Sequence, residues 1–422
     1  MATSLAPDRR WRMPEAPARL PDGAIENSRW YRNTVRALYL VAAAVAIRAV
    51  IFIPAATEGV DFTPIWRAVV KYTSGAPVYD EDYTTTDPHY LYSPGGTFLL
   101  APIGILPSEE TARWVMMALG AASILAALAL AARMISARFF RPMLAIAVIG
   151  TFAPAEPVVS TLRYTNINGF LLLLMVLFTW VSLSDVPDTF SRRGLFRWRT
   201  VASGLLLAVA LSIKPHFIVL AVILLISRQL VALVIAGLGT ILFFAIGWFT
   251  MNTPGDYVDR LLPYLGEPRD YHNGSIAGMA AQLGWAPGVE LAIKVVFLAV
   301  VAAATVLLLR WREEDPVMWA FSTLAVLISG ITMAGGLHQG YYAMWLLPMA
   351  VTVFSPKSPM HSAPMWLAFT AFLVAFEWPA DGWPLIAEVL RWRASIGWLA
   401  LPLIVAVWAI LQRRRGHSSR LG

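Results

Sequence analysis

Acidic, imidazole and phenolic side chains gather in one segment that follows the first long apolar run of the chain. Asp61 opens this segment, and Asp87-Pro88-His89-Tyr90-Leu91-Tyr92 lies near its end, before the turn residues Ser93-Pro94-Gly95-Gly96. A carboxylate near a low-dielectric boundary has a raised pKa unless it is paired, which suits a general base. Asp61 is therefore a candidate base, and the structural alternative is that it caps the helix predicted over Thr63–Tyr72.

Other polar groups of this segment and of a later loop are suited to holding a sugar. Histidine and tyrosine stack on sugar rings or hydrogen-bond their hydroxyls, although an interfacial aromatic belt with a Pro-Gly turn has the same composition. Asp270-Tyr271-His272-Asn273 is predicted to contact a glycan, because one Asp and one His are a weak metal signal. The candidate sugar and acceptor residues are Asp87, His89, Tyr90, Tyr92, Asn166, Asn168, Asp270, Asn273, Gln339 and Tyr341.

Three cationic or titratable residues are candidates for a phosphate site. Lys214 precedes Pro215 at a break between two short apolar runs, where a cation suits a phosphate but also suits simple snorkelling. His338 follows Gly335-Gly336 and is predicted to bind phosphate as imidazolium or to orient the base, unless it is only a satisfied histidine. Arg48 lies mid-span, where a structural pair with Glu156 competes with a lipid-phosphate contact.

The composition predicts a polytopic membrane protein. Of 422 residues, 58% are hydrophobic and 14% are charged, whereas soluble domains are about 45–50% apolar and about 25% charged. The apolar residues form runs long enough to cross a bilayer as helices. The net charge of +7 comes from tails and short loops, so it indicates cytoplasmic loops rather than a nucleic-acid partner. We therefore expect an all-α, multi-pass protein of the plasma membrane.

Basic loops orient the predicted spans. The chain is divided into a cytoplasmic tail (1–36), one transmembrane domain (37–412) and a second cytoplasmic tail (413–422), with outer loops near 58–112 and 251–288 that form the site. Gly95–Leu106 is short and broken by prolines, so it is predicted to be juxtamembrane or re-entrant. About twelve spans (10–13) are expected near 37–57, 113–134, 142–161, 167–184, 200–213, 215–227, 229–250, 289–310, 316–335, 340–355, 363–379 and 396–412.

This topology places the candidate residues on the outer face, from six separate connections, as expected of a single site. The chain has no cysteine, and no Walker loop, dinucleotide turn, nucleophile elbow or zinc-protease helix is present. No metal or other cofactor is predicted. Because nucleotide sugars are cytosolic, an enzyme with an outer site needs a membrane-carried donor, which would arrive laterally between helices.

The same residues resemble a known family. Asp61-Phe62, Asp87–Gly96, Tyr164-Thr165-Asn166-Ile167-Asn168-Gly169, Lys214-Pro215 and Gln339-Gly340-Tyr341-Tyr342 occur in order along the chain. They resemble polyprenyl-phosphate-dependent glycosyltransferases of the C superfamily, in particular actinobacterial arabinofuranosyltransferases that add α-1,3 branches to the arabinan of arabinogalactan and lipoarabinomannan. Ser93 replaces one proline that is common in these proteins, which leaves the local loop shape open.

The resemblance implies a GT-C type helical bundle and an inverting transfer from decaprenyl-phosphoryl arabinofuranose to an arabinan acceptor. Asp61 would be the base, with Lys214 and His338 at the phosphate. One alternative is the related branch that uses polyprenyl-phosphate mannose. An alternative of another class is a transporter or flippase of lipid-linked sugars, although no internal repeat supports it. The sequence leaves the oligomeric state open.

Overall fold

The computed structural model describes residues 28–57, 61–184, 197–374, 380 and 382–418. Every regular element in these ranges is a helix, and their β interaction is an isolated bridge between Ala155 and Val374. The predicted all-α class is therefore confirmed. Most of the two predicted tails, as well as residues 58–60 of the first outer loop, lie outside the described residues.

Six helices in the described ranges are long and apolar enough to cross a membrane. They are α1 (Arg29–Ile47, continued by the π-helix Arg48–Phe52 and α2, Ile53–Ala55), α5 (Glu109–Ile135), α12 (Leu230–Thr250), α15 (Pro287–Leu308), α16 (Pro316–Ala334) and α20 (Arg393–Ser418). These helices confirm the helical membrane class. The number of spans, about twelve, stays a prediction.

Shorter apolar helices account for other predicted spans. They are α6 (Phe140–Phe152), α8 (Asn168–Leu183), α10 (Trp198–Ile213), a 3-10 turn Pro215–Val219 with α11 (Leu220–Ile226), and α18 (Ala363–Leu373). The predicted span 142–161 is interrupted after α6 and continues as α7 (Glu156–Tyr164). The predicted span 340–355 is a 3-10 helix (Gly340–Leu346), a short α17 (Leu347–Val351) and a further 3-10 turn (Thr352–Phe354), with Pro348 interrupting its hydrogen bonding.

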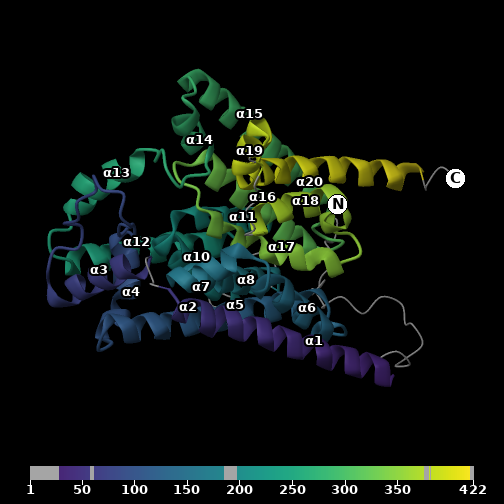
Figure 1. Ribbon diagram of the computed structural model, residues 1–422, viewed down its shortest axis with the longest axis horizontal. Helices are drawn as coiled ribbons and strands as arrows, with labels where there is room; N and C mark the ends of the chain where they lie inside the picture. The colour runs from purple at the N-terminus through teal and green to yellow at the C-terminus, as the bar shows by residue number, and fades with distance from the viewer. Residues whose placement is uncertain (1–27, 58–60, 185–196, 375–379, 381, 419–422) are drawn as a thin grey trace, which may run out of the picture.

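The remaining helices are short and lie beside the long ones. They are α3 (Phe62–Ser74), α4 (Pro94–Leu100, continued by the 3-10 helix Ala101–Ile105), a π-helix (Tyr257–Leu261) with α13 (Leu262–Gly266), α14 (Ile276–Leu283) and α19 (Pro384–Arg391). The start of α1 and the end of α20 lie on one side of the molecule, whereas α3, α4 and α13 lie on the opposite side (Figure 1).

Glycines bring α4 into direct backbone contact with two longer helices. A Cβ added at Gly247 of α12 would lie 2.0 Å from the Pro94 carbonyl oxygen, and one added at Gly96 would lie 2.8 Å from the Ser212 carbonyl oxygen. Ser93 caps α4 by accepting a hydrogen bond from the Gly96 N–H (3.1 Å), and its hydroxyl donates to the Ser212 carbonyl (2.7 Å). The Ser-Pro-Gly-Gly turn thus packs α4 between α12 and the end of α10.

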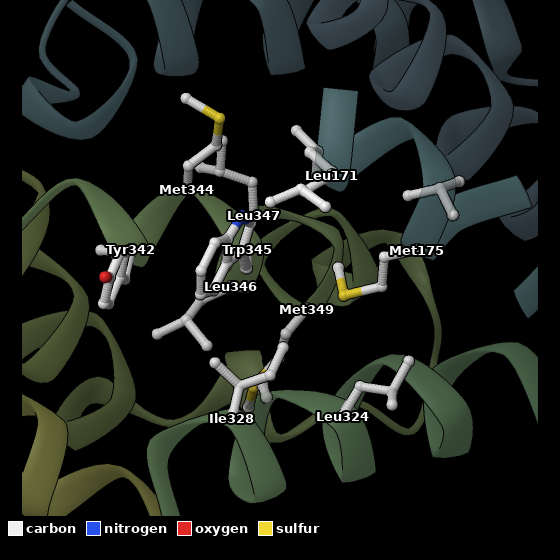
Figure 2. Close-up of a cluster of buried hydrophobic side chains, with 14 of the residues drawn as sticks. Leu171, Met175, Leu324, Ile328, Tyr342, Met344, Trp345, Leu346, Leu347 and Met349 are labelled. Carbon is white, nitrogen blue, oxygen red and sulfur yellow. The ribbon is translucent and has the colours of Figure 1, made fainter. Parts of the chain in front are cut away.

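A buried hydrophobic cluster packs α8 and α16 against the segment Gly340–Val351 (Figure 2). Trp345 and Tyr342, from the 3-10 helix Gly340–Leu346, stack with a ring-centroid distance of 4.7 Å. They belong to the same buried core as Leu171 of α8 and Ile328 of α16. Tyr342 lies at the edge of this cluster, so one of its faces is available to a polar neighbour.

Candidate active site

Asp61 occupies the N-cap position of α3, but its carboxylate makes no capping hydrogen bond to that helix. The Oδ2 atom instead accepts a hydrogen bond from Nδ2 of Asn166 at 3.3 Å. The backbone therefore fits the structural alternative, whereas the side chain is directed to a group from another part of the chain. This leaves the carboxylate free for chemistry.

Two asparagines connect Asp61 to Lys214. Asn166 Oδ1 accepts hydrogen bonds from the Asn168 backbone N–H (3.2 Å) and from Asn168 Nδ2 (2.8 Å), and Asn168 Oδ1 accepts one from Lys214 Nζ (2.9 Å). The turn between α7 and α8 that holds both amides includes Thr165, which has a positive φ of 56°. We call these four residues the Asp61–Lys214 chain; it joins α3, the α7–α8 turn and the break after α10.

The environment of Asp61 favours proton uptake. Burial raises the pKa of this carboxyl above its usual value, while the hydrogen bond from Asn166 and the positive charge of Lys214 lower it, with burial as the larger effect. A carboxylate with a raised pKa is a better base than an exposed one. The predicted role of Asp61 is thus chemically reasonable in this environment.

Aromatic rings surround the Lys214 ammonium group. Its Nζ atom lies 4.4 Å from the ring centroid of Tyr342, 5.2 Å from that of Trp345 and 5.8 Å from that of Tyr341. Ring faces attract a cation and exclude water. One of the three ammonium donors is used by Asn168, and no other described residue accepts a hydrogen bond from this group. The cation therefore keeps capacity for an anionic ligand.

Tyr92 forms another wall of this site. It is half-buried, and burial together with the nearby charges of Asp61 and Tyr342 raises the pKa of its phenol. The phenol is therefore neutral and available for hydrogen bonding. Its backbone is fixed because the Tyr79 hydroxyl donates to the Tyr92 carbonyl at 2.9 Å. Of the predicted sugar-binding residues, Tyr92 and Tyr341 lie beside the Asp61–Lys214 chain.

A cavity of about 670 Å³ opens next to the Asp61–Lys214 chain, on the side of Pro215 and His216. Its wall is mostly apolar and comes from the first outer loop, the break after α10, α12, the π-helix before α13, and α16. The lining residues are Ser93, Leu211, Ser212, Pro215, His216, Ile218, Thr240, Phe244, Tyr257, Ile331 and Gly335. An elongated apolar ligand would fit such a cavity with its polar end at Lys214.

Two of the predicted sugar-binding residues have structural roles instead. Tyr90 is fully buried and donates its hydroxyl hydrogen to Thr97 Oγ1 at 2.8 Å, so it belongs to the core. Asn273 is also buried; its amide donates to the carbonyls of Arg269 and Gly336, and its Oδ1 accepts from the His338 N–H. Asn273 thus fastens two outer connections together. In both cases a buried polar group satisfies its hydrogen bonds within the protein.

Asn166 and Asn168, the two predicted sugar-binding residues of the Asp61–Lys214 chain, also use their side-chain amides for hydrogen bonds within the protein. Asn168 is fully buried, and both ends of its side-chain amide are engaged, whereas Asn166 is 8% exposed. Their predicted contact with sugar hydroxyls stays a prediction. The structure adds a role that the sequence did not reveal, which is to connect the carboxylate with the cation.

Four other predicted residues lie in the loops predicted to be on the outer face. His89 packs against the rings of Tyr83 and Tyr264, with its Nδ1 at 3.3 Å from Glu81 Oε2. Asp87 and Asp270 are exposed. Gln339 donates to the His272 carbonyl at 3.0 Å, which ties the last outer connection to the second outer loop. These residues form a polar surface apart from the buried chain.

His338 is buried between the rings of Trp398 and Tyr342, at ring-centroid distances of 4.6 and 5.9 Å. Both of its ring nitrogens are without a hydrogen-bond partner among the described residues. Burial, together with nearby His216, lowers the pKa of His338 to about 3. The ring is therefore neutral at pH 7 in this structure, and its predicted contact with a phosphate stays a prediction.

Arg48 is not brought to the site. Its side chain is exposed within the π-helical part of the first span, and no ion pair with Glu156 is present in the described ranges. The predicted structural pair with Glu156 or another buried acid is thus wrong, because the Arg48 side chain is exposed and no described acid forms an ion pair with it. Nor does any group of three or more His, Asp or Glu side chains in the described part of the chain come together as a metal site.

The fold is that of a helical membrane protein in which a buried acid, Asp61, is connected to a cation, Lys214, through two amides. The model of glycosyltransferase family 87 matches residues 90–334, and the chain belongs to this family. The predicted enzyme class, a membrane glycosyltransferase, is therefore confirmed.

Named relatives agree with the family. The chain is 34% identical to an α-(1→3)-arabinofuranosyltransferase of Corynebacterium glutamicum, over 83% of this chain and 81% of the relative. The enzymes of the same name from Mycolicibacterium smegmatis and Mycobacterium tuberculosis are 32% and 33% identical, over 84% and 82% of this chain and 80% and 77% of the relatives. The resemblance inferred from the sequence motifs is confirmed.

Sequence reasoning missed several residues of the site. Tyr342 and Trp345 were part of an aromatic run that also fits a membrane-interface belt, so their contact with Lys214 was not predicted. Tyr342 and Trp345 are three residues apart, a spacing typical of one helix face, so no sequence signal distinguished them from ordinary core residues.

Proposed function

We propose that this protein transfers arabinofuranose from decaprenyl-phosphoryl arabinofuranose to a hydroxyl of a growing arabinan, forming α-1,3 branches on the extracytoplasmic face. The observation that carries the proposal is the Asp61–Lys214 chain, which holds a base and a cation in one partly buried site. Glycosyl transfer from a phosphate needs these two groups. The names of the relatives support arabinofuranose as the sugar.

The reaction proceeds as a single displacement. Asp61 accepts the proton of the acceptor hydroxyl while its oxygen attacks the anomeric carbon, and the bond from that carbon to the phosphate oxygen breaks. The electron pair leaves with the phosphate, whose growing negative charge is stabilised by Lys214. Attack from the side opposite the leaving group inverts the configuration at the anomeric carbon.

The site and the cavity fit the two parts of such a donor. Tyr92, Tyr341 and Tyr342 offer neutral phenols and ring faces to the sugar. The apolar cavity next to Pro215 would take the first prenyl units, so that the lipid enters sideways from the membrane. Both chain ends would then lie in the cytoplasm, on the side opposite α3 and α13.

The proposal is tested with the purified full-length protein, synthetic decaprenyl-phosphoryl arabinofuranose and a short α-1,5-arabinan acceptor. An α-1,3-branched product is expected, and Asp61→Asn should lower kcat by about 10²–10⁴-fold because the base is lost. Asp82→Asn, which alters an exposed carboxylate of the same loop, is the matched comparison for general effects on the loop.

Three results would contradict the proposal in different ways. Transfer from prenyl-phosphate mannose, with none from the arabinose donor, would assign the protein to the mannosyltransferase alternative. Equal rates for the wild type and Asp61→Asn would remove Asp61 from the mechanism. Lipid-linked sugar moved across vesicles without any glycosidic product would favour the flippase alternative.

A further inference from the structure

The first turn of α5 contacts the chain on both sides of Asp61. Arg113 donates from Nη2 to the carbonyl oxygens of Pro54 (2.5 Å) and Thr57 (2.7 Å), at the end of the first span. Glu109, four residues earlier on the same face of α5, accepts a hydrogen bond from the Thr63 hydroxyl at 2.5 Å (Oγ1 to Oε1). One helical turn thus holds the segment that ends before Asp61 and the segment that begins after it.

The contacts of Arg113 follow from how the first span ends. The last carbonyls of a helix have no partner within it, and they form the negative end of its dipole. The span is additionally distorted by the π-helix Arg48–Phe52, which is followed by Pro54, a residue without an N–H. The Arg113 guanidinium adds charge-assisted hydrogen bonds to the carbonyls of Pro54 and Thr57, although the Pro54 carbonyl also accepts one from the Thr57 N–H at 3.3 Å. Arg113 therefore fixes the direction in which the chain leaves the span.

The contact of Glu109 fixes the start of α3. Thr63 is the second residue of α3, and Asp61 directly precedes this helix. Because the Asp61 side chain does not cap α3 and has one hydrogen bond among the described residues, at 3.3 Å, its own contacts hold it weakly. The position of its carboxylate therefore depends on its backbone. The backbone, in turn, is held through Thr63, Pro54 and Thr57.

We propose that Glu109 and Arg113 are positioning residues for Asp61, which together set the carboxylate at the distance that catalysis requires. This inference rests on the proposed function, in which Asp61 is the base. A displacement of about 1 Å of a catalytic group costs up to about 10²-fold in rate. If Glu109 and Arg113 contributed to stability alone, loss of their contacts would lower the melting temperature without changing the rate of the folded enzyme.

The test compares Thr63→Val and Arg113→Met with Thr63→Ser and Glu110→Ala. Thr63→Val keeps the shape but removes the donor to Glu109, whereas Thr63→Ser keeps the donor; Glu110 is exposed and adjacent to Glu109. We expect kcat of Thr63→Val and of Arg113→Met to fall about 10–100-fold with KM unchanged. Thr63→Ser and Glu110→Ala should retain wild-type kcat. Melting temperature is measured for every variant, and Thr63→Val decides the result if Arg113→Met does not fold.

A second measurement reports the position of residue 61 without using activity. The natural chain has no cysteine, so Asp61→Cys introduces a single thiol. Its reaction with a water-soluble maleimide should accelerate several-fold when Thr63→Val or Arg113→Met is added. The inference would be overturned if folded Thr63→Val and Arg113→Met proteins had wild-type kcat and if neither change altered the labelling of Asp61→Cys. Faster labelling, combined with no transfer activity of the enzyme that retains Asp61, would support the positioning role of Glu109 and Arg113 and overturn the proposed function instead.

Discussion

Two amides separate the carboxylate of Asp61 from the ammonium of Lys214. A direct ion pair would lower the pKa of Asp61 strongly and would use the cation's donors. With Asn166 and Asn168 between them, the two charges remain coupled, as the effect of Lys214 on the pKa of Asp61 indicates. At the same time the carboxylate keeps its basicity and the ammonium keeps donors for a ligand. This spacing suits two groups that act on opposite sides of one reacting carbon, one on the attacking oxygen and the other on the leaving oxygen.

Asn166→Ala is predicted to move the acidic limb of the kcat/KM–pH profile to higher pH. The reaction needs ionised Asp61, so activity is lost as pH falls through the pKa of this group. Because the hydrogen bond from Asn166 lowers that pKa, its removal raises the pKa further and less of the base is ionised at a given acidic pH.

The comparison is Asn33→Ala, which alters an exposed amide on α1 and should leave the profile in place. A limb that stays fixed or moves to lower pH in Asn166→Ala would show that Asp61 is not the group titrating in the acidic limb.

At the scale of elements, close helix packing positions the first outer loop. Gly247 of α12 lies against the Pro94 carbonyl. This contact fixes the position of α4 and of Ser93, which lines the cavity. The sequence predicted a short, proline-broken element at 95–106 but not its partners. A glycine in an apolar run is compatible with many packing arrangements, and only the tertiary contacts distinguish them.

Gly247→Ala is predicted to destabilise the protein by about 1–3 kcal/mol, because its Cβ would overlap the Pro94 carbonyl oxygen and the backbones must separate. The matched control is Gly237→Ala on the same helix, where nothing lies within 4 Å of the added Cβ. That change should be neutral or stabilising by about 0.5–1 kcal/mol. Thermal unfolding in detergent measures both, and equal melting temperatures for the two variants would contradict the packing argument.

At the scale of the whole molecule, five segments distant in sequence contribute to the cavity beside Lys214. The helices that line it, α10, α12 and α16, also form the membrane-embedded bundle. An apolar cavity between such helices is accessible to a lipid chain without passage through water. Under the proposed function, the lipid-linked donor would reach this cavity without leaving the bilayer.

Thr240→Trp is predicted to raise KM for decaprenyl-phosphoryl arabinofuranose about tenfold or more, because the larger side chain fills part of the cavity. A donor with a two-isoprene chain should be affected much less. Leu238→Trp is the control, since Leu238 lies on the same helix and is 63% exposed. The cavity would not be the prenyl site if both donors lost affinity equally in Thr240→Trp, or if neither did.

The sequence by itself determined the class of protein and its chemical groups. Apolar runs of bilayer length require helices, because backbone polar groups in hydrocarbon must be satisfied within the segment. The motifs around Asp61 and Lys214 identified the family, which the comparisons confirm. These features are local, so they can be read along the chain without knowledge of its folding.

Only the tertiary structure decided which polar residues form the site. Tyr90 and Tyr92 are two residues apart in one motif, yet Tyr90 is in the core and Tyr92 lies beside Asp61. Asn168 and Asn273 both seemed suitable for a sugar, but one connects Asp61 to Lys214 and the other fastens two loops. The physical reason is that a buried polar group must find a partner. That partner is distant in sequence, so only the fold determines which one it is.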